Sequence, residues 1–236
     1  MPADRLEFVL VHGAWHGAWA WDLVVPALRG AGHTAVAVDL PVEDLAVDGS
    51  GYAAVIAGAI ERAGLRAPVL VGHSLSGLAI PLVPSRAPVA MLVYLGALIP
   101  SPGETMSAVF AREGVRGDVR RFMESDADGR SRWATAEGAV HVLYHDCGET
   151  VARAAVARLR WQSDAPFGEP CPLERFPDVP TSYVAMREDR MIRPDWSRRA
   201  APARLGVEPV EIGGGHSPML ADPEGLAALL VGLARG

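Results

Sequence analysis

The chain has 236 residues, of which 50% are hydrophobic, and a formal net charge of -6 at pH 7. This length fits one α/β-sized domain with a full core and argues against a second independent domain. An acidic balance without any basic block argues against nucleic acids and anionic membrane surfaces as partners. No apolar stretch is long enough for a membrane span, and the run 8–11 is too short for a signal-peptide core. We therefore expect a soluble, cytoplasmic protein.

Missing residue types limit the chemistry further. All 22 basic residues are arginine, so no lysine is available as a Schiff base or general base. The two cysteines, Cys147 and Cys171, do not make a disulfide framework. No helical H-x-x-x-H pair and no C-x-x-C pair occurs, and His12 and His16 lie on a glycine-rich loop. We predict neither a metal site nor a cofactor.

Short apolar runs recur along the chain and end at Gly, Asp or Pro. They are largely continuous rather than alternating, which is typical of strands buried on both faces. The expected strands are 6–11, 34–38, 69–71, 90–95, 182–186 and 208–212. The helical patterns between them cover 19–31, 52–63, 75–83, 194–199 and 223–234. This alternation predicts an α/β fold, with a mostly parallel central sheet and helices on both faces.

The alternation stops in the middle of the chain. Residues 101–176 carry helical patterns, most clearly at 150–160, and no convincing core strand. The aromatic residues Trp133, Tyr144 and Trp161 need a surface to pack on, which argues against a disordered linker. We interpret 101–176 as a helical cap inserted into a core made of 1–100 and 177–236.

The segment Gly72-His73-Ser74-Leu75-Ser76-Gly77 follows a short apolar strand and leads into a helical pattern. A serine on such a sharp strand-to-helix turn is a nucleophile elbow, which exposes its hydroxyl at the top of a sheet. The usual pattern is G-x-S-x-G, whereas Ser76 stands two residues after Ser74 and glycine arrives one residue later. Ser76 is small enough for the turn, although its role stays open. The alternative is a helix N-cap serine.

A serine hydroxyl needs a base and an orienting acid to act as a nucleophile. His216 is the best-placed base, because it follows the last expected strand and three glycines. Asp189 comes just after the expected strand 182–186, where such sheets place their sites. Its neighbour Glu188 is the rival for the acid. The other histidines, His16, His33, His141 and His145 among them, are interpreted as surface or packing residues or as parts of other motifs.

Ester chemistry at Ser74 also needs two backbone N–H groups that face the developing oxyanion. We expect one donor from Leu75, directly after the nucleophile. The second is expected from Ala14 in the loop His12-Gly13-Ala14-Trp15, directly after the first strand. Gly13 and Trp15 of this loop are candidate substrate-binding residues. A turn glycine without further role is compatible with the same geometry at Gly13.

The whole chain resembles the α/β-hydrolase superfamily. Its opening, Phe8-Val9-Leu10-Val11-His12-Gly13-Ala14-Trp15-His16-Gly17-Ala18-Trp19, is similar to the plant methylesterase and hydroxynitrile lyase group and its bacterial relatives. Glu188-Asp189-Arg190 and Gly215-His216 also match that group. The resemblance implies an α/β-hydrolase fold, a Ser74–Asp189–His216 triad and a cap over a small, mainly apolar pocket. It also implies small methyl or aryl esters as substrates and, because members of the group often form homodimers, a homodimer.

The sequence also departs from the lyases of that group. Lyases carry threonine where Gly13 stands and lysine directly after the catalytic histidine, where this chain has Ser217. Without that cation, a leaving cyanide has no charge partner. We therefore predict a serine esterase that works through an acyl-enzyme. A hydroxynitrile lyase or another non-hydrolytic enzyme, and a non-catalytic small-ligand receptor, are the alternatives.

Overall fold

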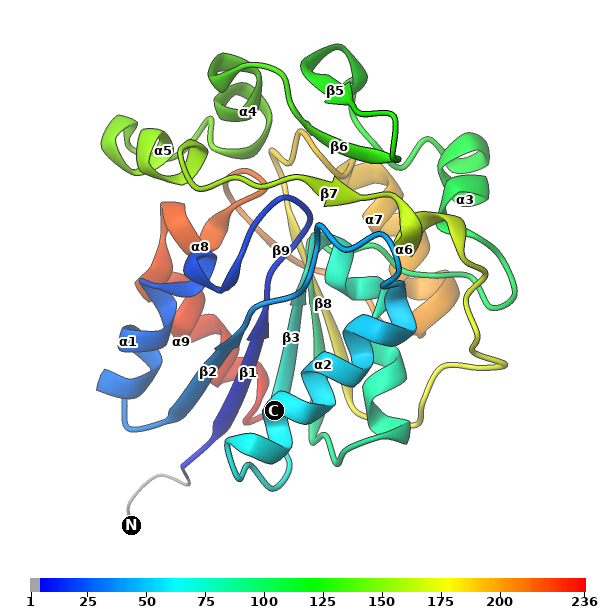
Figure 1. Ribbon diagram of the computed structural model, residues 1–236. Coiled ribbons are helices and arrows are strands. Elements are labelled where there is room, and N and C mark those ends of the chain that lie inside the picture. Colours follow the sequence, from blue (N-terminus) through cyan, green and yellow to red (C-terminus); the bar gives the residue numbers. More distant parts are fainter. Residues whose placement is uncertain (1–4) are drawn as a thin grey trace.

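A six-stranded sheet forms the centre of the computed structural model, which describes residues 5–236 (Figure 1). The strand order is β2-β1-β3-β4-β8-β9, and all of its pairings are parallel. The six strands lie within one or two residues of the positions predicted from the apolar runs. They are β1 (Glu7–Val11), β2 (Thr34–Val38), β3 (Val69–His73), β4 (Met91–Leu95), β8 (Thr181–Met186) and β9 (Val210–Ile212).

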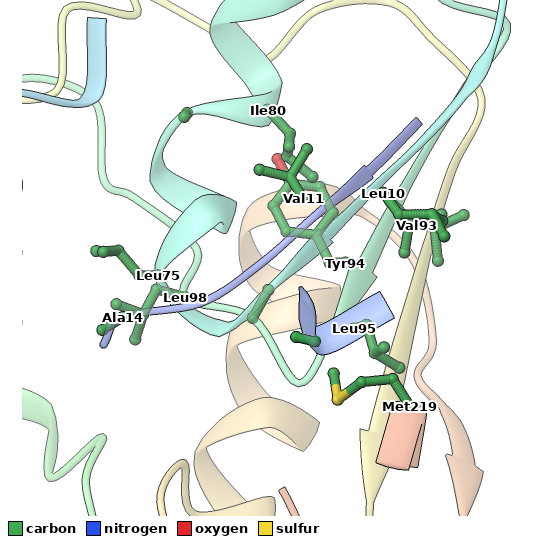
Figure 2. Close-up of a cluster of buried hydrophobic side chains, with 14 of the residues drawn as sticks. Leu10, Val11, Ala14, Leu75, Ile80, Val93, Tyr94, Leu95, Leu98 and Met219 are labelled. Carbon is green, nitrogen blue, oxygen red and sulfur yellow. The ribbon is translucent and has the colours of Figure 1, made fainter. Parts of the chain in front are cut away.

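The inner strands explain the continuous apolar runs. Every residue of β3 is buried, because this strand lies between β1 and β4 and is covered on both faces. Figure 2 shows part of the resulting core and labels Leu10 and Val11 of β1 and Val93, Tyr94 and Leu95 of β4, the two strands that flank β3. The strand that precedes Ser74 is therefore the most enclosed part of the sheet.

Helices cover both faces of the sheet, as predicted (Figure 1). On one face, α1 (Val24–Gly30) packs against α9 (Pro223–Leu233). On the other face, α2 (Gly49–Arg62) packs against the short helix η3 (Ile80–Ser85). Two further helices, α7 (Pro194–Ala200) and α8 (Pro218–Ala221), follow β8 and β9 in the chain, and η5 (Ala201–Leu205) continues α7.

Two expected helices are interrupted, and proline accounts for both interruptions. The predicted helix 19–31 consists of the 3-10 turn η1 (Ala18–Trp21) and of α1, whose first turn contains Pro26. The predicted helix 75–83 consists of two 3-10 segments, η2 (Ser74–Leu78) and η3, and η3 contains Pro81 and Pro84. Proline lacks the N–H that an α-helix requires beyond its first turn, so neither segment can form one long α-helix.

Residues 101–176 lie across the carboxyl ends of the parallel strands (Figure 1). Their helices are α3 (Met106–Glu113), α4 (Ala136–Leu143), α5 (Glu149–Val156) and α6 (Ala165–Gly168), with the short turn η4 (Arg120–Phe122). The expected helix 150–160 is present in part as α5. The segment also contains an antiparallel sheet that the sequence did not predict, formed by β5 (Met123–Ser125), β6 (Arg130–Trp133) and β7 (Gln162–Ser163). Strands of two to four residues are too short for a period-two pattern to emerge.

None of the helices in the described part of the chain has the length and hydrophobicity that a bilayer crossing requires.

Candidate active site

Ser74 stands at a sharp turn where β3 ends and η2 begins. Its φ angle is 55°, one of only two positive values at non-glycine residues in 5–236. Such a backbone costs roughly 1–2 kcal/mol for a residue with a Cβ, so it persists only where the surroundings enforce it. The Ser74 carbonyl accepts a hydrogen bond from Leu98 N–H at 2.9 Å, which fixes the far side of the turn. The predicted strand-turn-helix setting is therefore present.

The residues around the turn explain why Ser76 is tolerated. The Ser76 hydroxyl is buried. Its one proton lies within hydrogen-bond reach of two carbonyls, that of His73 at 2.9 Å and that of Val11 at 3.2 Å. A Cβ on Gly77 would collide with the backbone carbonyl of Leu98, and a Cβ on Gly72 would lie 2.7 Å from Ile80. The position that cannot carry a side chain is thus Gly77 rather than residue 76.

The three predicted triad residues meet at the carboxyl ends of β3, β8 and β9. His216 Nε2 lies 3.0 Å from Ser74 Oγ, and His216 Nδ1 lies 2.8 Å from Asp189 Oδ2. Asp189 Oδ1 accepts hydrogen bonds from the N–H groups of Met191 (2.7 Å) and Ile192 (2.9 Å). A carboxylate that accepts at both oxygens favours the proton on Nδ1, which leaves Nε2 free to accept the Ser74 proton.

Asp189 and Glu188 occupy different environments. Asp189 is buried and faces His216, whereas Glu188 is exposed and accepts a hydrogen bond from Gly214 N–H in the loop before the histidine. Asp146 contacts the same loop, with Oδ2 2.6 Å from Gly215 N. Glu188 therefore contacts the backbone of the His216 loop, and only Asp189 reaches the imidazole.

The loop after β1 passes directly beside the nucleophile. A Cβ on Gly13 would lie 2.7 Å from Ser74 Cβ and 3.0 Å from His73 Nδ1, so only glycine fits without a shift. Ala14 and Leu75 are buried and line the same pocket as Ser74; Figure 2 shows both beside Leu98. The two expected oxyanion donors thus belong to residues on the wall next to Ser74.

Two hydrogen bonds of His16 hold the loop after β1 in place. Its Nδ1 lies 2.7 Å from the Ala14 carbonyl and its Nε2 lies 2.7 Å from the Tyr144 hydroxyl. The carbonyl can only accept, so Nδ1 carries the proton and Nε2 accepts from Tyr144. Burial lowers the pKa of His16 to about 3, which keeps it neutral. His16 is thus a packing residue, as interpreted from the sequence, and its contacts fix the carbonyl of Ala14.

Segment 101–176 contributes contacts to the same loop that the sequence did not reveal. Arg160 donates from its backbone N–H to the Trp15 carbonyl (2.8 Å) and from Nε to the His16 carbonyl (2.9 Å). Trp15, with φ 63°, donates from Nε1 to the Ser131 carbonyl at 3.1 Å and packs edge-to-face on Trp133. These partners lie more than a hundred positions apart in the chain. Local sequence patterns cannot predict contacts between residues so far apart.

A small pocket opens at Ser74. Its wall is apolar apart from Ser74 and Arg116. The lining residues are Ala14, Trp15, Ser74, Leu75, Leu98, Arg116, Phe167, Met191 and Ile192. Gly13 lies behind this wall and is not among its lining residues, whereas Trp15 is. Arg116 was not singled out from the sequence, because it is one of many arginines in an Arg-rich segment.

Comparison with known proteins identifies the family of this chain. The family model described as "Alpha/beta hydrolase family" matches residues 8–229. Methylesterase 2 of Arabidopsis thaliana is 28% identical over 98% of this chain and 96% of its own length. A pyrethroid hydrolase of Sphingobium wenxiniae is 28% identical over 97% of this chain and 87% of its own. The crystal structure of a pyrethroid hydrolase from Sphingobium faniae shares the fold, with a TM-score of 0.80 and 24% identity over 98% of both chains. The predicted resemblance and fold class are confirmed: the chain belongs to the alpha/beta hydrolase family.

Proposed function

We propose that this protein is a serine esterase that hydrolyses small carboxylic esters through an acyl-enzyme. The observation that carries the proposal is the continuous contact from Ser74 Oγ to His216 Nε2 and from His216 Nδ1 to Asp189. The names of relatives that span nearly the whole chain, a methylesterase and a pyrethroid hydrolase, support ester hydrolysis.

In this mechanism His216 Nε2 removes the Ser74 proton while Oγ attacks the ester carbonyl. Asp189 stabilises the imidazolium that forms and keeps it oriented, without taking up the proton itself. His216 then protonates the leaving alkoxide, and the acyl group stays on Ser74. A water molecule, deprotonated by the same imidazole, attacks the acyl-enzyme and releases the acid. Ser74, His216 and Asp189 thus supply the nucleophile and every proton transfer of the cycle.

The oxyanion of each tetrahedral intermediate is assigned to the backbone N–H groups of Ala14 and Leu75. Their residues flank Ser74 in one pocket, and Gly13 lets the first loop approach Ser74 closely. Loss of one such donor typically costs about 3 kcal/mol of transition-state stabilisation. His16 acts through the Ala14 carbonyl as a positioning residue for this loop.

We propose further that residues 101–176 form a cap over the site and complete the substrate pocket. Trp15 and Phe167 supply large apolar surfaces beside Ser74, which suits methyl or aryl esters of small acids. The homodimer, the cytoplasmic location and the absence of nucleic-acid or membrane partners stay predictions from the sequence.

The two alternatives have weaker support. Gly13 and Ser217 stand where the lyases of the resembling group carry threonine and lysine, so a neutral serine replaces the cation that follows the histidine in those lyases. A receptor needs no nucleophile, yet Ser74 keeps a strained backbone and a hydrogen-bonded imidazole. Neither alternative explains this arrangement as directly as ester hydrolysis.

Turnover of p-nitrophenyl butyrate and methyl salicylate by the wild type and by Ser74→Ala tests the proposal. We expect wild-type turnover with a burst of p-nitrophenol equal to the enzyme concentration, and loss of both in Ser74→Ala. Turnover that survives the substitution would refute the assignment of Ser74. Tight binding of salicylate without turnover of any ester would favour a receptor, and cyanide release from mandelonitrile would favour a lyase.

A further inference from the structure

Arg116 is the one charged residue in the wall of the Ser74 pocket. It also lines a second, more open hollow, whose wall includes Phe110, Arg120, Asp164 and Phe167. Arg116 and Phe167 are shared by both walls. The arginine therefore stands where the inner pocket meets the outer hollow.

The backbone of Arg116 is held against the segment that orients the triad carboxylate. Gly117 N–H donates to the Met191 carbonyl (3.1 Å), and Arg193 N–H donates to the Val115 carbonyl (2.8 Å). This antiparallel bridge pairs Arg116 with Ile192, whose own N–H donates to Asp189. The position of Arg116 relative to the triad is thus set by main-chain contacts rather than by a free loop.

The guanidinium of Arg116 is stacked rather than paired. Its Cζ lies 3.6 Å from the centroid of Phe110 and 5.0 Å from that of Phe167. Stacking uses the face of the guanidinium and leaves the N–H donors, which lie in its plane, available to a ligand. Within residues 5–236, no carboxylate forms an ion pair with these nitrogens, and the charge of Asp164, in the wall of the outer hollow, acts on Arg116 without such a contact.

Burial makes this unpaired cation costly. It lowers the pKa of Arg116 to about 10, and Asp164 offsets only part of the effect. A half-buried guanidinium gains most from a ligand carboxylate, with which it forms two parallel hydrogen bonds. The apolar remainder of the pocket would then enclose the carbon chain of that ligand.

The pocket next to Arg116 is the acyl side of the site. The leaving alcohol must lie near His216, which protonates it, and His216 is not among the residues of this pocket. Ala14 and Leu75, the oxyanion residues, do line it. A group that extends from the ester carbonyl away from His216 therefore points along the wall that ends at Arg116.

We propose that Arg116 makes the site selective for esters whose acyl chain ends in a carboxylate, that is, monoesters of small dicarboxylic acids. The proposal rests on the esterase function proposed above and names its substrate class. The Ser74 hydroxyl attacks the esterified end, while the free carboxylate binds Arg116 and takes no part in bond breaking.

The test compares monomethyl glutarate with the methyl ester in which an isopropyl group replaces the carboxylate, by proton release. We expect the wild type to prefer the anionic ester by at least about tenfold in kcat/KM, the range of one charged hydrogen-bonded contact. Arg116→Met should remove this preference mainly through KM, read as the ratio of kcat/KM for the two esters within the same variant. Arg116→Lys should keep part of it. Arg120→Met is the matched control, because Arg120 is exposed and lines only the outer hollow.

A wild type that turns over the neutral ester as well as the anionic one would overturn this inference and leave the esterase proposal intact. A preference that survives in Arg116→Met would do the same. Hydrolysis of p-nitrophenyl butyrate without hydrolysis of either methyl ester would overturn this inference alone. If none of these esters is hydrolysed, the esterase proposal fails as well, and calorimetry on Ser74→Ala still decides on Arg116. Calorimetry compares the affinity of Ser74→Ala for monomethyl glutarate with that of the double variant that also carries Arg116→Met. An affinity at least about tenfold weaker in the double variant supports the anion site, and unchanged or absent binding refutes it.

Discussion

His73 donates a hydrogen bond from Nε2 to the backbone carbonyl of His216, with a separation of 2.8 Å. The residue before the nucleophile thus holds the main chain of the base, independently of the contact between Ser74 and the imidazole. His73 is fully buried, and burial holds its pKa well below the usual value, so it stays neutral with its proton on Nε2. The elbow and the base loop are therefore joined at two points.

Replacing His73 by phenylalanine should reduce kcat more than it reduces stability. An aromatic ring, slightly larger than imidazole, is kept while the donor to His216 is lost, and a small displacement of a base typically costs about 10- to 100-fold in rate. Steady-state kinetics with p-nitrophenyl butyrate, together with the melting temperature, measure both effects. An unchanged kcat in a folded variant would show that the His216 loop needs no support from His73.

The identity of the triad acid can be resolved by two isosteric variants. Asp189→Asn should lower kcat by about 10³–10⁴-fold, because asparagine cannot favour the required imidazole tautomer. Glu188→Gln should leave kcat within about threefold, since Glu188 is exposed and contacts the Gly214 N–H instead. The same assay measures both variants, and reversed results would move the acid role to Glu188.

Gly13→Ala should damage activity although it adds only one methyl group. The new Cβ would lie 2.7 Å from Ser74 Cβ, so the loop that carries Ala14 must move away from the nucleophile. We expect kcat to fall by about 100-fold, equivalent to the loss of one oxyanion donor. Gly30→Ala is the control, because nothing lies within 4 Å of a Cβ there. Equal activity in both variants would contradict the proposed role of the loop.

Ser76 and Gly77 should respond in opposite ways to alanine. Ser76→Ala removes a buried hydroxyl that donates to backbone carbonyls, so we expect a loss of about 1 kcal/mol of stability and kcat within about threefold. Gly77→Ala places a Cβ against the Leu98 carbonyl, and we expect a loss of more than about 2 kcal/mol. Urea unfolding measures both, and a larger loss for Ser76→Ala would reverse this interpretation.

The buried histidines should make the fold sensitive to mild acid. Burial lowers the pKa of His12 to about 4 and of His16 to about 3, while the unfolded chain takes up protons at these side chains from about pH 6.5 downward. Below about pH 6.5, the protein takes up protons when it unfolds. The free energy of unfolding therefore has its full value above this pH and decreases as the pH falls. Each residue should cost about 2 kcal/mol at pH 5.

Urea unfolding at pH 5 and pH 8 measures this loss in the wild type and in His16→Gln. The glutamine variant should lose less stability between the two pH values than the wild type does. His141→Gln, which changes an exposed imidazole, is the control and should retain the wild-type difference. Equal losses in all three proteins would show that protonation of His16 does not drive the effect.

The sequence predicted the sheet and the three residues at its carboxyl edge because both depend on local signals. A continuous apolar run such as 69–71 indicates a strand that is buried on both faces. The turn residues after it indicate where a nucleophile can stand at the edge of the sheet. The sequence favours Asp189 as the acid, but it keeps the neighbouring Glu188 as a rival. Adjacent side chains share every local signal, and only the path of the loop decides which one faces His216.

Contacts between distant segments were the part that local patterns could not supply. Arg116 and Arg160 are chemically identical in the sequence and lie in the same Arg-rich segment. The guanidinium of Arg116 lies over Phe110 and near Phe167, whereas Arg160 donates to the loop after β1. The small sheet of β5, β6 and β7 was likewise invisible, because its pairing depends on tertiary contacts rather than on periodicity.

The hydrogen bonds of Arg160 to the loop after β1 also bear on how the protein is synthesised. Arg160 and His16 are separated by 144 positions, and His216 and Ser74 by 142. A ribosome synthesises roughly 5–20 residues per second, so it delivers the nucleophile and its neighbouring loop several seconds before their partners. A nascent chain can therefore build most of β1 to β4 while it still lacks a functioning serine. Reactivity at Ser74 therefore arises only after the segment that carries His216 has emerged.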